Sequence, residues 1–284
     1  MGRAHYLLAL KDYWTGDPRD GVAHAHEAVR LLEGSEDRHF FGLAYWILGL
    51  NHLVVGEFEP ALTAARALQG IGQAMTDPRL LSFAAASIGW AQAMRGDVDA
   101  GVVACMEAVD LARDPVSHAL AHGYLGYAYV AQGNPAAIAT LERATEALGR
   151  LKLPHLVSRA RTWLAEAYLA KDDVKTARQL AETAFAEAGD YWFSVAWGAR
   201  VLARIAYAEG DVAIAEARLA TSLAIFTRVG AAFEVGRTHL LVAELARRRD
   251  DRSAMQRHLA EATRWLAPLD VPRYHERLRA LAEP

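Results

Sequence analysis

A helix-breaking turn recurs seven times along this chain at nearly equal intervals. The turns lie at Gly16-Asp17, Gly56-Glu57, Gly96-Asp97, Gly133-Asn134, Asp172-Asp173, Gly210-Asp211 and Asp250-Asp251. The steps from one turn to the next in the numbering are therefore 40, 40, 37, 39, 38 and 40. A fixed period of this length is typical of arrays in which each repeat is one supersecondary unit stacked on its neighbours. A single compact core usually stops growing near the length of this chain, 284 residues, so the length predicts either two domains or a repeat array. The fixed period favours the repeat array.

Two residue types keep a fixed distance from every turn. A small residue stands seven positions before it, at Ala9, Gly49, Gly89, Gly126, Ala165, Ala203 and Ala243. An aliphatic residue stands eight positions before it, at Leu8, Leu48, Ile88, Leu125, Leu164, Leu202 and Val242. A small residue lets a partner helix approach closely, and the aliphatic neighbour fills the space beside it. Each period is therefore predicted to be a hairpin of two α-helices.

The turn residues fit the ends of such helices. Glycine adopts the left-handed conformation that ends a helix, and the acidic or amide residue after it can cap the next helix. The pattern predicts first helices near residues 3–14, 38–55, 78–94, 116–131, 155–170, 190–208 and 232–248. It predicts second helices near residues 18–32, 58–73, 98–112, 135–150, 174–187, 212–228 and 252–267. A polar helix at 273–282 is expected to cap the C-terminal end of the array.

The repeat resembles the tetratricopeptide repeat. The stretches Tyr124-Leu125-Gly126-Tyr127-Ala128-Tyr129 and Trp163-Leu164-Ala165-Glu166-Ala167-Tyr168 are similar to its consensus. The resemblance implies an all-α, right-handed superhelical solenoid of seven hairpins over residues 1–267, followed by a capping helix over 268–284. The period is about 39 residues, longer than the roughly 34 of the standard repeat. This long variant is similar to arrays in bacterial signalling ATPases, transcription regulators and quorum-sensing peptide receptors, which implies a sensing or interaction module.

Composition and charge exclude several classes of partner. The net charge is −3, so no overall field attracts nucleic acid or an anionic membrane. No run of 18 apolar residues and no targeting segment is visible, so a membrane protein is not expected. The only cysteine, Cys105, fits a reducing, cytoplasmic compartment. Because Met1 falls almost directly on the first predicted helix, one interpretation is that the chain is part of a longer protein.

The sequence contains no recognisable catalytic motif. It lacks a phosphate-binding GxxxxGK[ST] loop, HExxH, GxSxG and CxxC. His118 and His122 stand four residues apart on one helix face, but two histidines without a third ligand bind metal weakly. We therefore expect no enzyme, no metal site and no cofactor. Cys105 is expected to be buried and inert.

The resemblance implies that the first helix of each hairpin lines the concave face. The residues that face the groove are then those 13, 10, 6, 3 and 2 positions before the first residue of each turn. These positions supply the candidate residues for binding a ligand or peptide: Tyr6, Tyr13, Trp46, Leu50, Phe83, Trp90, Met94, Tyr127, Arg159, Trp197, Arg200, Arg204 and Arg237. The first four repeats present apolar and aromatic groups there, whereas the last three present arginines. Exposed apolar patches usually mark binding sites, and arginine suits carboxylates and phosphates.

The expected partner is a protein or peptide with apolar and acidic segments. Its acidic part is expected to lie toward Arg200, Arg204 and Arg237. The alternative is that the aromatic residues are buried between repeats and that Glu166 and Glu244 neutralise the arginines.

The function that follows from the sequence is a non-catalytic scaffold for peptides or proteins. A small-molecule sensor domain of a transcription regulator is a second hypothesis, although Asn and Gln are rare at the concave positions. A self-assembling structural module is a third, with the chain forming a homo-oligomer.

Overall fold

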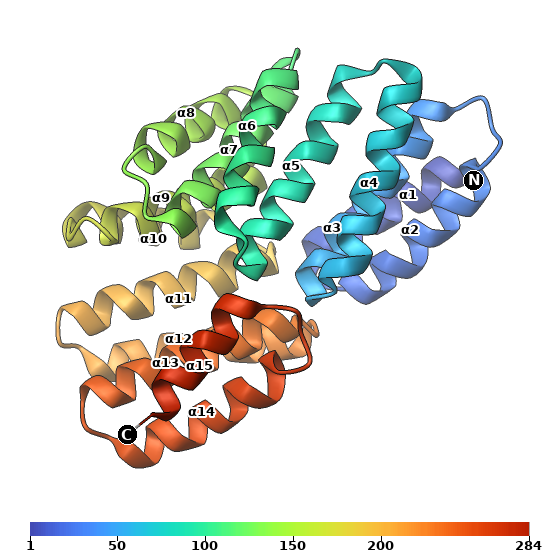
Figure 1. Cartoon of the computed structure of the whole chain (residues 1–284). Coiled ribbons are helices and arrows are strands. Elements are labelled where there is room, and N and C mark those ends of the chain that lie inside the picture. The colour runs from blue at the N-terminus through green and yellow to red at the C-terminus, as the bar shows by residue number, and fades with distance from the viewer. Residues whose placement is uncertain (284) are drawn as a thin grey trace.

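The computed structural model describes residues 1–283 as fifteen α-helices, without a β-strand in that range (Figure 1). The helices are α1 (Gly2–Thr15), α2 (Pro18–Leu32), α3 (Arg38–Val55), α4 (Phe58–Met75), α5 (Pro78–Arg95), α6 (Val98–Leu111), α7 (Pro115–Gln132), α8 (Ala137–Arg150), α9 (Pro154–Leu169), α10 (Val174–Glu187), α11 (Trp192–Ala208), α12 (Val212–Arg228), α13 (Ala232–Arg248), α14 (Arg252–Leu266) and α15 (Pro272–Ala282). The fold is the all-α repeat solenoid that the sequence predicts.

The recurring turns end the first helix of each hairpin in the expected way. Gly16, Gly56 and Gly96 have φ angles of 105°, 91° and 114°, in the left-handed region that glycine tolerates best. Asp172 and Asp250 replace glycine at two later turns and also have positive φ angles, 59° and 57°. A short polar side chain is the usual substitute for glycine in this conformation.

The caps of the second helices follow the expectation only in part. The side chains of Asp173, Asp211 and Asp251 each accept a hydrogen bond from a backbone N–H in the first turn of α10, α12 and α14. In contrast, the side chains of Glu57 and Asp97 make no such bond. They contact His52 and Arg95 of the preceding helix instead.

Close approach of the two helices explains why small residues precede the turns. A Cβ atom added to Gly89 of α5 would lie 2.7 Å from the carbonyl oxygen of Gly101 in α6. The reverse substitution, at Gly101, meets the carbonyl oxygen of Gly89 at the same distance. No side chain fits at that separation, so this hairpin requires glycine on both sides.

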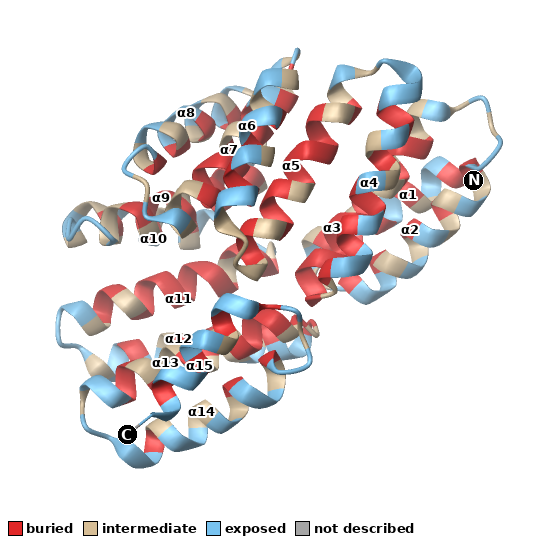
Figure 2. Cartoon of the chain, in the orientation of Figure 1, coloured by how far each residue is buried: buried red, intermediate tan, exposed pale blue. Residues whose placement is uncertain are grey.

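The helices form two rows, an inner and an outer one, that wind into a superhelix. Odd-numbered helices form the inner row and even-numbered helices the outer row, and each outer helix packs on the inner helices before and after it. Helices ten places apart also meet, because α1 contacts α11, α3 contacts α13 and α5 contacts α15. Buried residues concentrate along the inner helices, whereas the outer helices expose much of their length (Figure 2). The ends of α1, α3 and α5 meet the starts of α11, α13 and α15: Gly16 lies beside Trp192, and Gly56 lies beside Phe233.

The last helix, α15, lies in the position of a further inner helix. It packs on α13 and α14 through Tyr274, Leu278 and Leu281, which are buried. It also touches α5, and Arg273 donates a hydrogen bond to the carbonyl oxygen of Ala131 at 2.9 Å. Besides covering the end of the array, α15 therefore ties the C-terminal hairpin back to the middle of the chain.

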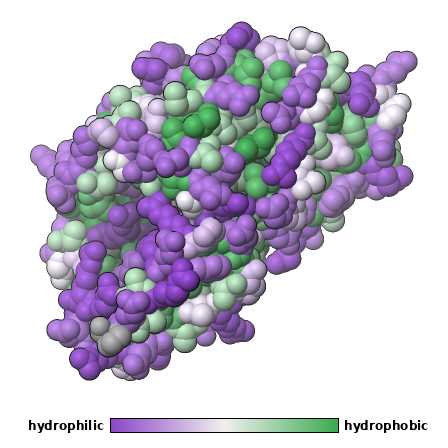
Figure 3. All heavy atoms as spheres, viewed as in Figure 1, coloured by the Kyte–Doolittle hydropathy of each residue, from purple (hydrophilic) through white to green (hydrophobic). Residues whose placement is uncertain are grey.

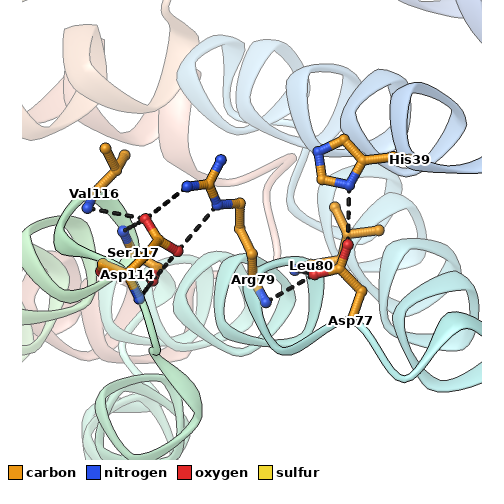
Figure 4. A network of polar contacts seen from close by, with 7 residues as sticks. All are labelled: His39, Asp77, Arg79, Leu80, Asp114, Val116 and Ser117. Atoms are coloured by element: carbon orange, nitrogen blue, oxygen red, sulfur yellow. Dashed lines mark hydrogen bonds and ion pairs between the residues drawn. The ribbon is translucent and has the colours of Figure 1, made fainter.

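A ladder of polar contacts links the starts of the first four inner helices. Arg3 contacts Asp37, and His39 lies 2.9 Å from Asp77. Arg79 in turn reaches Asp114, with nitrogen–oxygen distances of 2.8 and 3.0 Å (Figure 4). In each step a side chain near the start of one inner helix reaches the aspartate before the next.

Asp114 has the strongest cap in this ladder. It accepts hydrogen bonds from the backbone N–H groups of Val116 and Ser117 and from the Ser117 hydroxyl. Burial alone would raise the pKa of Asp114, but the hydrogen bonds from Arg79 and Ser117 hold it well below its usual range. The ladder therefore depends on a charged carboxylate.

The outer surface carries both polar and apolar residues. On the face seen in Figure 3, hydrophobic residues gather in the upper middle, where Figure 1 places α5 and α6. Val103 and Met106 of α6 are exposed apolar residues. Within residues 1–283, no helix is long and apolar enough to cross a membrane.

Candidate ligand-binding centre

The predicted concave residues lie mostly inside the molecule. Ten of them are buried: Tyr6, Tyr13, Leu50, Phe83, Trp90, Met94, Tyr127, Arg159, Trp197 and Arg200. Trp46, Arg204 and Arg237 are partly buried. The expectation of an exposed aromatic groove is therefore wrong, because these aromatic residues pack against one another between inner helices, as the alternative interpretation allowed.

Four inner helices bring six aromatic residues together, and we call this cluster the aromatic centre. It consists of Trp90 of α5, Tyr124 and Tyr127 of α7, Trp163 of α9, and Phe193 and Trp197 of α11. Trp90 stacks on Tyr124 at 4.8 Å between ring centroids, and Tyr127 lies 5.1 Å from Trp163. Phe193 and Trp197 are 4.1 Å apart.

Arg159 of α9 lies within this cluster without an acidic partner. Its side chain is only 3% exposed, and none of the described residues places a carboxylate within 4.0 Å of it. It donates hydrogen bonds to the hydroxyl groups of Tyr13, at 2.8 Å, and Tyr124, at 3.2 Å. Five aromatic rings surround the guanidinium carbon at 5.2 to 5.9 Å: Trp14, Trp90, Tyr124, Trp163 and Phe193. Aromatic faces attract the cation but do not neutralise it.

The first hairpin closes the other side of this site. Trp192 at the start of α11 donates its indole N–H to the carbonyl oxygen of Tyr13, at 2.9 Å. Burial raises the pKa of the Tyr13 hydroxyl, although the neighbouring Arg159 opposes the shift. Tyr13 therefore remains a neutral hydrogen-bond partner, and Arg159 keeps its positive charge.

A narrow slot reaches the guanidinium between α7 and α9. Its lining includes Gly123, Tyr124, Arg159 and Trp163, and its volume is about 10 Å³. That is the space of a single water molecule. A Cβ atom at Gly123 would meet nothing within 4 Å, so the glycine leaves one wall of the slot open.

Two more hydrogen-bond donors near the slot have no acceptor. The indole N–H groups of Trp90 and Trp163 are buried and unpartnered in the described part of the chain. Buried donors normally find an acceptor, so an orphan donor calls for an explanation. Together with Arg159, they give the centre a surplus of donors and positive charge, which a ligand with acceptor oxygens would satisfy.

The arginines of the later hairpins, by contrast, have partners. Arg200 forms a buried ion pair with Glu234 and also donates to the Thr238 hydroxyl at 3.3 Å. Arg237 donates to the other oxygen of Glu234 at 3.0 Å. Burial alone would raise the pKa of Glu234, but Arg200 and Arg237 lower it. Contrary to the prediction, Arg200 and Arg237 are therefore not free for an acidic ligand, because they share the single carboxylate of Glu234.

The remaining predicted residues fall into separate contacts. Arg204 lies 3.5 Å from Glu166, as the alternative interpretation allowed. Trp46 stacks on Phe83 at 4.8 Å, and Tyr6 packs edge-on against Phe40. These residues join neighbouring inner helices and are not in the aromatic centre.

Sequence reasoning missed three members of the centre: Tyr124, Trp163 and Phe193. Tyr124 and Trp163 stand nine residues before their turns, beside the aliphatic column. Large aromatic residues directly preceding Leu125 and Leu164 are a visible signal. Because that position also belongs to the repeat consensus, it does not by itself indicate a site.

Other chemistry has little support in the described residues. No group of three or more His, Cys, Asp or Glu side chains between residues 1 and 283 is placed to hold a metal ion. Cys105 is fully buried, and burial raises the pKa of its thiol far above the usual range. It is therefore a packing residue.

Comparisons with known proteins identify the fold. No protein-family model and no curated protein matches the sequence. Among solved structures, a Rap protein complexed with competence and sporulation factor has a TM-score of 0.73 at 12% identity, covering 98% of this chain and 80% of that one. NprR in complex with its cognate peptide NprX has a TM-score of 0.67 at 12% identity, covering 99% and 82%. A tetratricopeptide protein of Thermus thermophilus, TTC0263, has a TM-score of 0.51 at 22% identity, covering 71% and 99%.

Proposed function

We propose that this chain, an array with the tetratricopeptide-type fold, is a non-catalytic module that binds a peptide segment of a partner. The proposed ligand has an acidic group that pairs with Arg159 and apolar side chains that pack on the aromatic centre. We further propose that the module serves bacterial signalling or regulation.

The unneutralised charge of Arg159 is the observation that carries this proposal. Burying a lone cation costs several kcal/mol unless another charge compensates it. Arg200 shows that the same fold can place a glutamate beside a buried arginine. At Arg159 the sequence supplies tyrosine hydroxyls and aromatic rings but no carboxylate, which leaves that role to a ligand.

The comparisons support a peptide as the class of ligand. NprR has this fold over nearly the whole chain, and its structure holds a cognate peptide. The Rap structure likewise holds competence and sporulation factor. At 12% identity these likenesses concern the fold, so the ligand chemistry proposed here depends on this chain's own residues.

The proposed contacts are Tyr13, Trp90, Tyr127, Arg159 and Trp197. Arg159 has N–H donors left after its two tyrosine bonds, and these would bind a carboxylate. The slot beside Gly123 admits one small group at present. A peptide side chain would enter as α7 and α9 separate, and its apolar neighbours would pack against the rings.

A pooled library of synthetic heptapeptides tests the proposal. Peptides that combine acidic and apolar residues should bind the full chain, whereas peptides without Asp or Glu should bind at least tenfold more weakly. Hydrogen bonds to a charged group contribute about 1.5–3 kcal/mol, which corresponds to tenfold or more in affinity. Arg159→Met should remove this preference.

Arg66→Met is the matched control, because Arg66 is exposed on α4, far in sequence from the site. This variant should bind as the wild type does. If no peptide binds at high micromolar concentration, or if Arg159→Met binds acidic peptides unchanged, the proposed function is wrong.

Self-association is a second candidate function, favoured by the outer face of α1. Leu7 and Leu8 are 58% and 41% exposed there, whereas Leu48, the equivalent of Leu8 in α3, is 5% exposed beneath α2. A second copy of the chain would cover the same face. Sedimentation velocity over a hundredfold range of concentration should then show a dimer that Leu7→Glu/Leu8→Glu abolishes, and a constant monomer would exclude this candidate.

A further inference from the structure

A second hollow lies on the outer surface, between the start of α7 and the end of α8. Its volume is about 390 Å³, within the range of small-molecule sites. Residues from α7 line one side (His118, Ala119 and His122), and residues from α8 line the other (Arg143, Ala147 and Arg150). Ala119 also lines the slot near Arg159, but the hollow contains no residue of the aromatic centre.

The hydrogen bonds inside this hollow define the state of His122. Its Nδ1 lies 2.8 Å from the carbonyl oxygen of His118, which can only accept a hydrogen bond. Nδ1 therefore carries the proton, and Nε2 is an acceptor. Arg143 points a guanidinium N–H at this Nε2, at 3.4 Å. The two histidines are therefore not arranged for a metal ion, because a cation would have to bind beside a guanidinium.

Positive charge in the hollow is only partly neutralised. Across residues 1–283, Arg143 has no carboxylate within 4.0 Å. Its side-chain hydrogen-bond contact is with the neutral His122 ring. Arg150 pairs with Glu146, and both of these side chains are about 70% exposed. An exposed pair of this kind is weak and open to competition. Arg79 and Arg277, in contrast, have carboxylate partners.

The remaining wall of the hollow is apolar. Ala119 is buried, Ala147 is partly buried, and Pro115 and Leu151 complete the lining. A site with an apolar floor and cationic side chains at its rim matches a ligand with a compact apolar body and one anionic group.

We propose that this hollow is a binding site for a small organic anion, with Arg143 pairing with its charge and Ala119, Ala147 and Leu151 packing on its apolar body. This site is separate from the proposed peptide site and stands independently of it. The shared chemistry covers both carboxylates and phosphate monoesters.

Titration calorimetry with the full chain tests the site using defined probes. Benzoate and phenyl phosphate distinguish the two anion classes. Benzyl alcohol has a similar apolar body without the charge, and inorganic phosphate has the charge without the body. At least one aromatic anion should bind, and both benzyl alcohol and inorganic phosphate should bind at least tenfold more weakly.

Two variants locate the binding. Arg143→Met should weaken the aromatic anion about tenfold, and Ala147→Phe should block the hollow and remove binding. Arg66→Met, on the outer helix α4, should leave affinity unchanged. Circular dichroism should show all three variants to be helical, because none removes a fully buried side chain. The proposal is overturned if no aromatic anion binds at millimolar concentration, if benzyl alcohol binds equally well, or if Arg143→Met behaves like Arg66→Met.

Discussion

Two arginines on neighbouring inner helices are buried almost equally, yet their surroundings differ in kind. Arg159 is 3% exposed and Arg200 is 5% exposed. Arg200 is paired with Glu234, whereas Arg159 has two tyrosine hydroxyls and five aromatic rings. Burial alone therefore does not reveal what a charged residue does. The carboxylate beside Arg200 fits a role in the fold, whereas the lack of one beside Arg159 among the described residues is the basis of the proposed role in binding.

The same contrast separates the two parts of the inner surface. From α5 to α11 the inner helices meet through aromatic rings in stacked, edge-on and tilted contacts. Between α11 and α13 the link is ionic and hydrogen-bonded, through Arg200, Glu234 and Thr238. Arg159 is a charged residue among these aromatic rings, and unlike Arg200 it has no carboxylate partner among the described residues.

The largest effect is expected from removing the carboxylate of the ionic part. Glu234→Gln should lower the free energy of unfolding by about 3–5 kcal/mol, because breaking a buried pair leaves an uncompensated charge. Arg200 would then be a buried cation without a charged partner, as Arg159 is, but with two aromatic rings near its guanidinium group instead of five. Equilibrium unfolding in urea measures the change.

Glu146→Gln is the control for this prediction. Glu146 pairs with Arg150 on the surface, with both side chains about 70% exposed. Its loss should change stability little. Equal stability of Glu234→Gln and the wild type would show that the buried pair does not support the fold, and the contrast between the two arginines would disappear.

An intermediate effect is expected from acid, through His155. This ring packs against Trp14 and Tyr191, and burial followed by the charge of Arg159 lowers its pKa to about 4. In the unfolded chain its pKa returns to about 6.5. The folded form binds the proton less readily than the unfolded chain. The stability contributed by the neutral His155 ring is therefore full above pH 6.5 and is lost as the pH falls toward 4. Because the ring is partly exposed and solvent screens its interactions, the loss from pH 7.5 to 5 should be smaller than the roughly 2 kcal/mol that the full pKa shift would give.

His155→Gln should therefore lose less stability than the wild type between pH 7.5 and 5. Burial also lowers the pKa of four other histidines, which add acid sensitivity in both proteins: His26, His122, His239 and His258. Arg159→Met should also reduce the acid loss, because the pKa of His155 rises once the cation is gone. Unfolding curves at the two pH values compare the three proteins, and parallel losses in all of them would contradict the prediction.

A smaller effect is expected from the polar ladder that joins the first inner helices. Asp114→Ala removes two backbone hydrogen bonds at the start of α7 and the contact with Arg79, and should cost about 1–2 kcal/mol. Asp211→Ala removes a single cap bond at the start of α12 and should cost less. Thermal unfolding of the two variants shows which one loses more stability. A larger loss of stability for Asp211→Ala than for Asp114→Ala would contradict this prediction.

The hairpins were predictable because their signals are local. A glycine seven residues before a turn, such as Gly89, meets a partner in the same hairpin, in this case Gly101, twelve residues later in the chain. The end of each first helix depends on one φ angle at the turn. Such features are encoded within a single repeat and recur seven times, so the sequence shows them clearly.

The site was predictable only in part, because it depends on contacts between distant turns of the superhelix. Arg159, Trp90, Tyr127 and Trp197 lie on inner helices as predicted, but their burial depends on how α5, α7, α9 and α11 pack on one another and on Tyr13 of α1. The pairing of Arg200 with Glu234 spans 34 residues, and Glu234 lies outside the positions assigned to the concave face. No local pattern separates a neutralised arginine from an unpaired one.

The most direct test compares Arg159→Met with Arg200→Met in equilibrium unfolding without ligand. Replacing an uncompensated cation with an apolar side chain of similar length relieves the charge burial and leaves two tyrosine hydroxyls without donors, so Arg159→Met should stay within about 1 kcal/mol of the wild type or exceed it. Arg200→Met should lose about 3 kcal/mol, because Glu234 remains buried without its main partner. If Arg159→Met loses as much as Arg200→Met, the aromatic cage holds Arg159 for the fold, and the account of a ligand-binding centre is wrong.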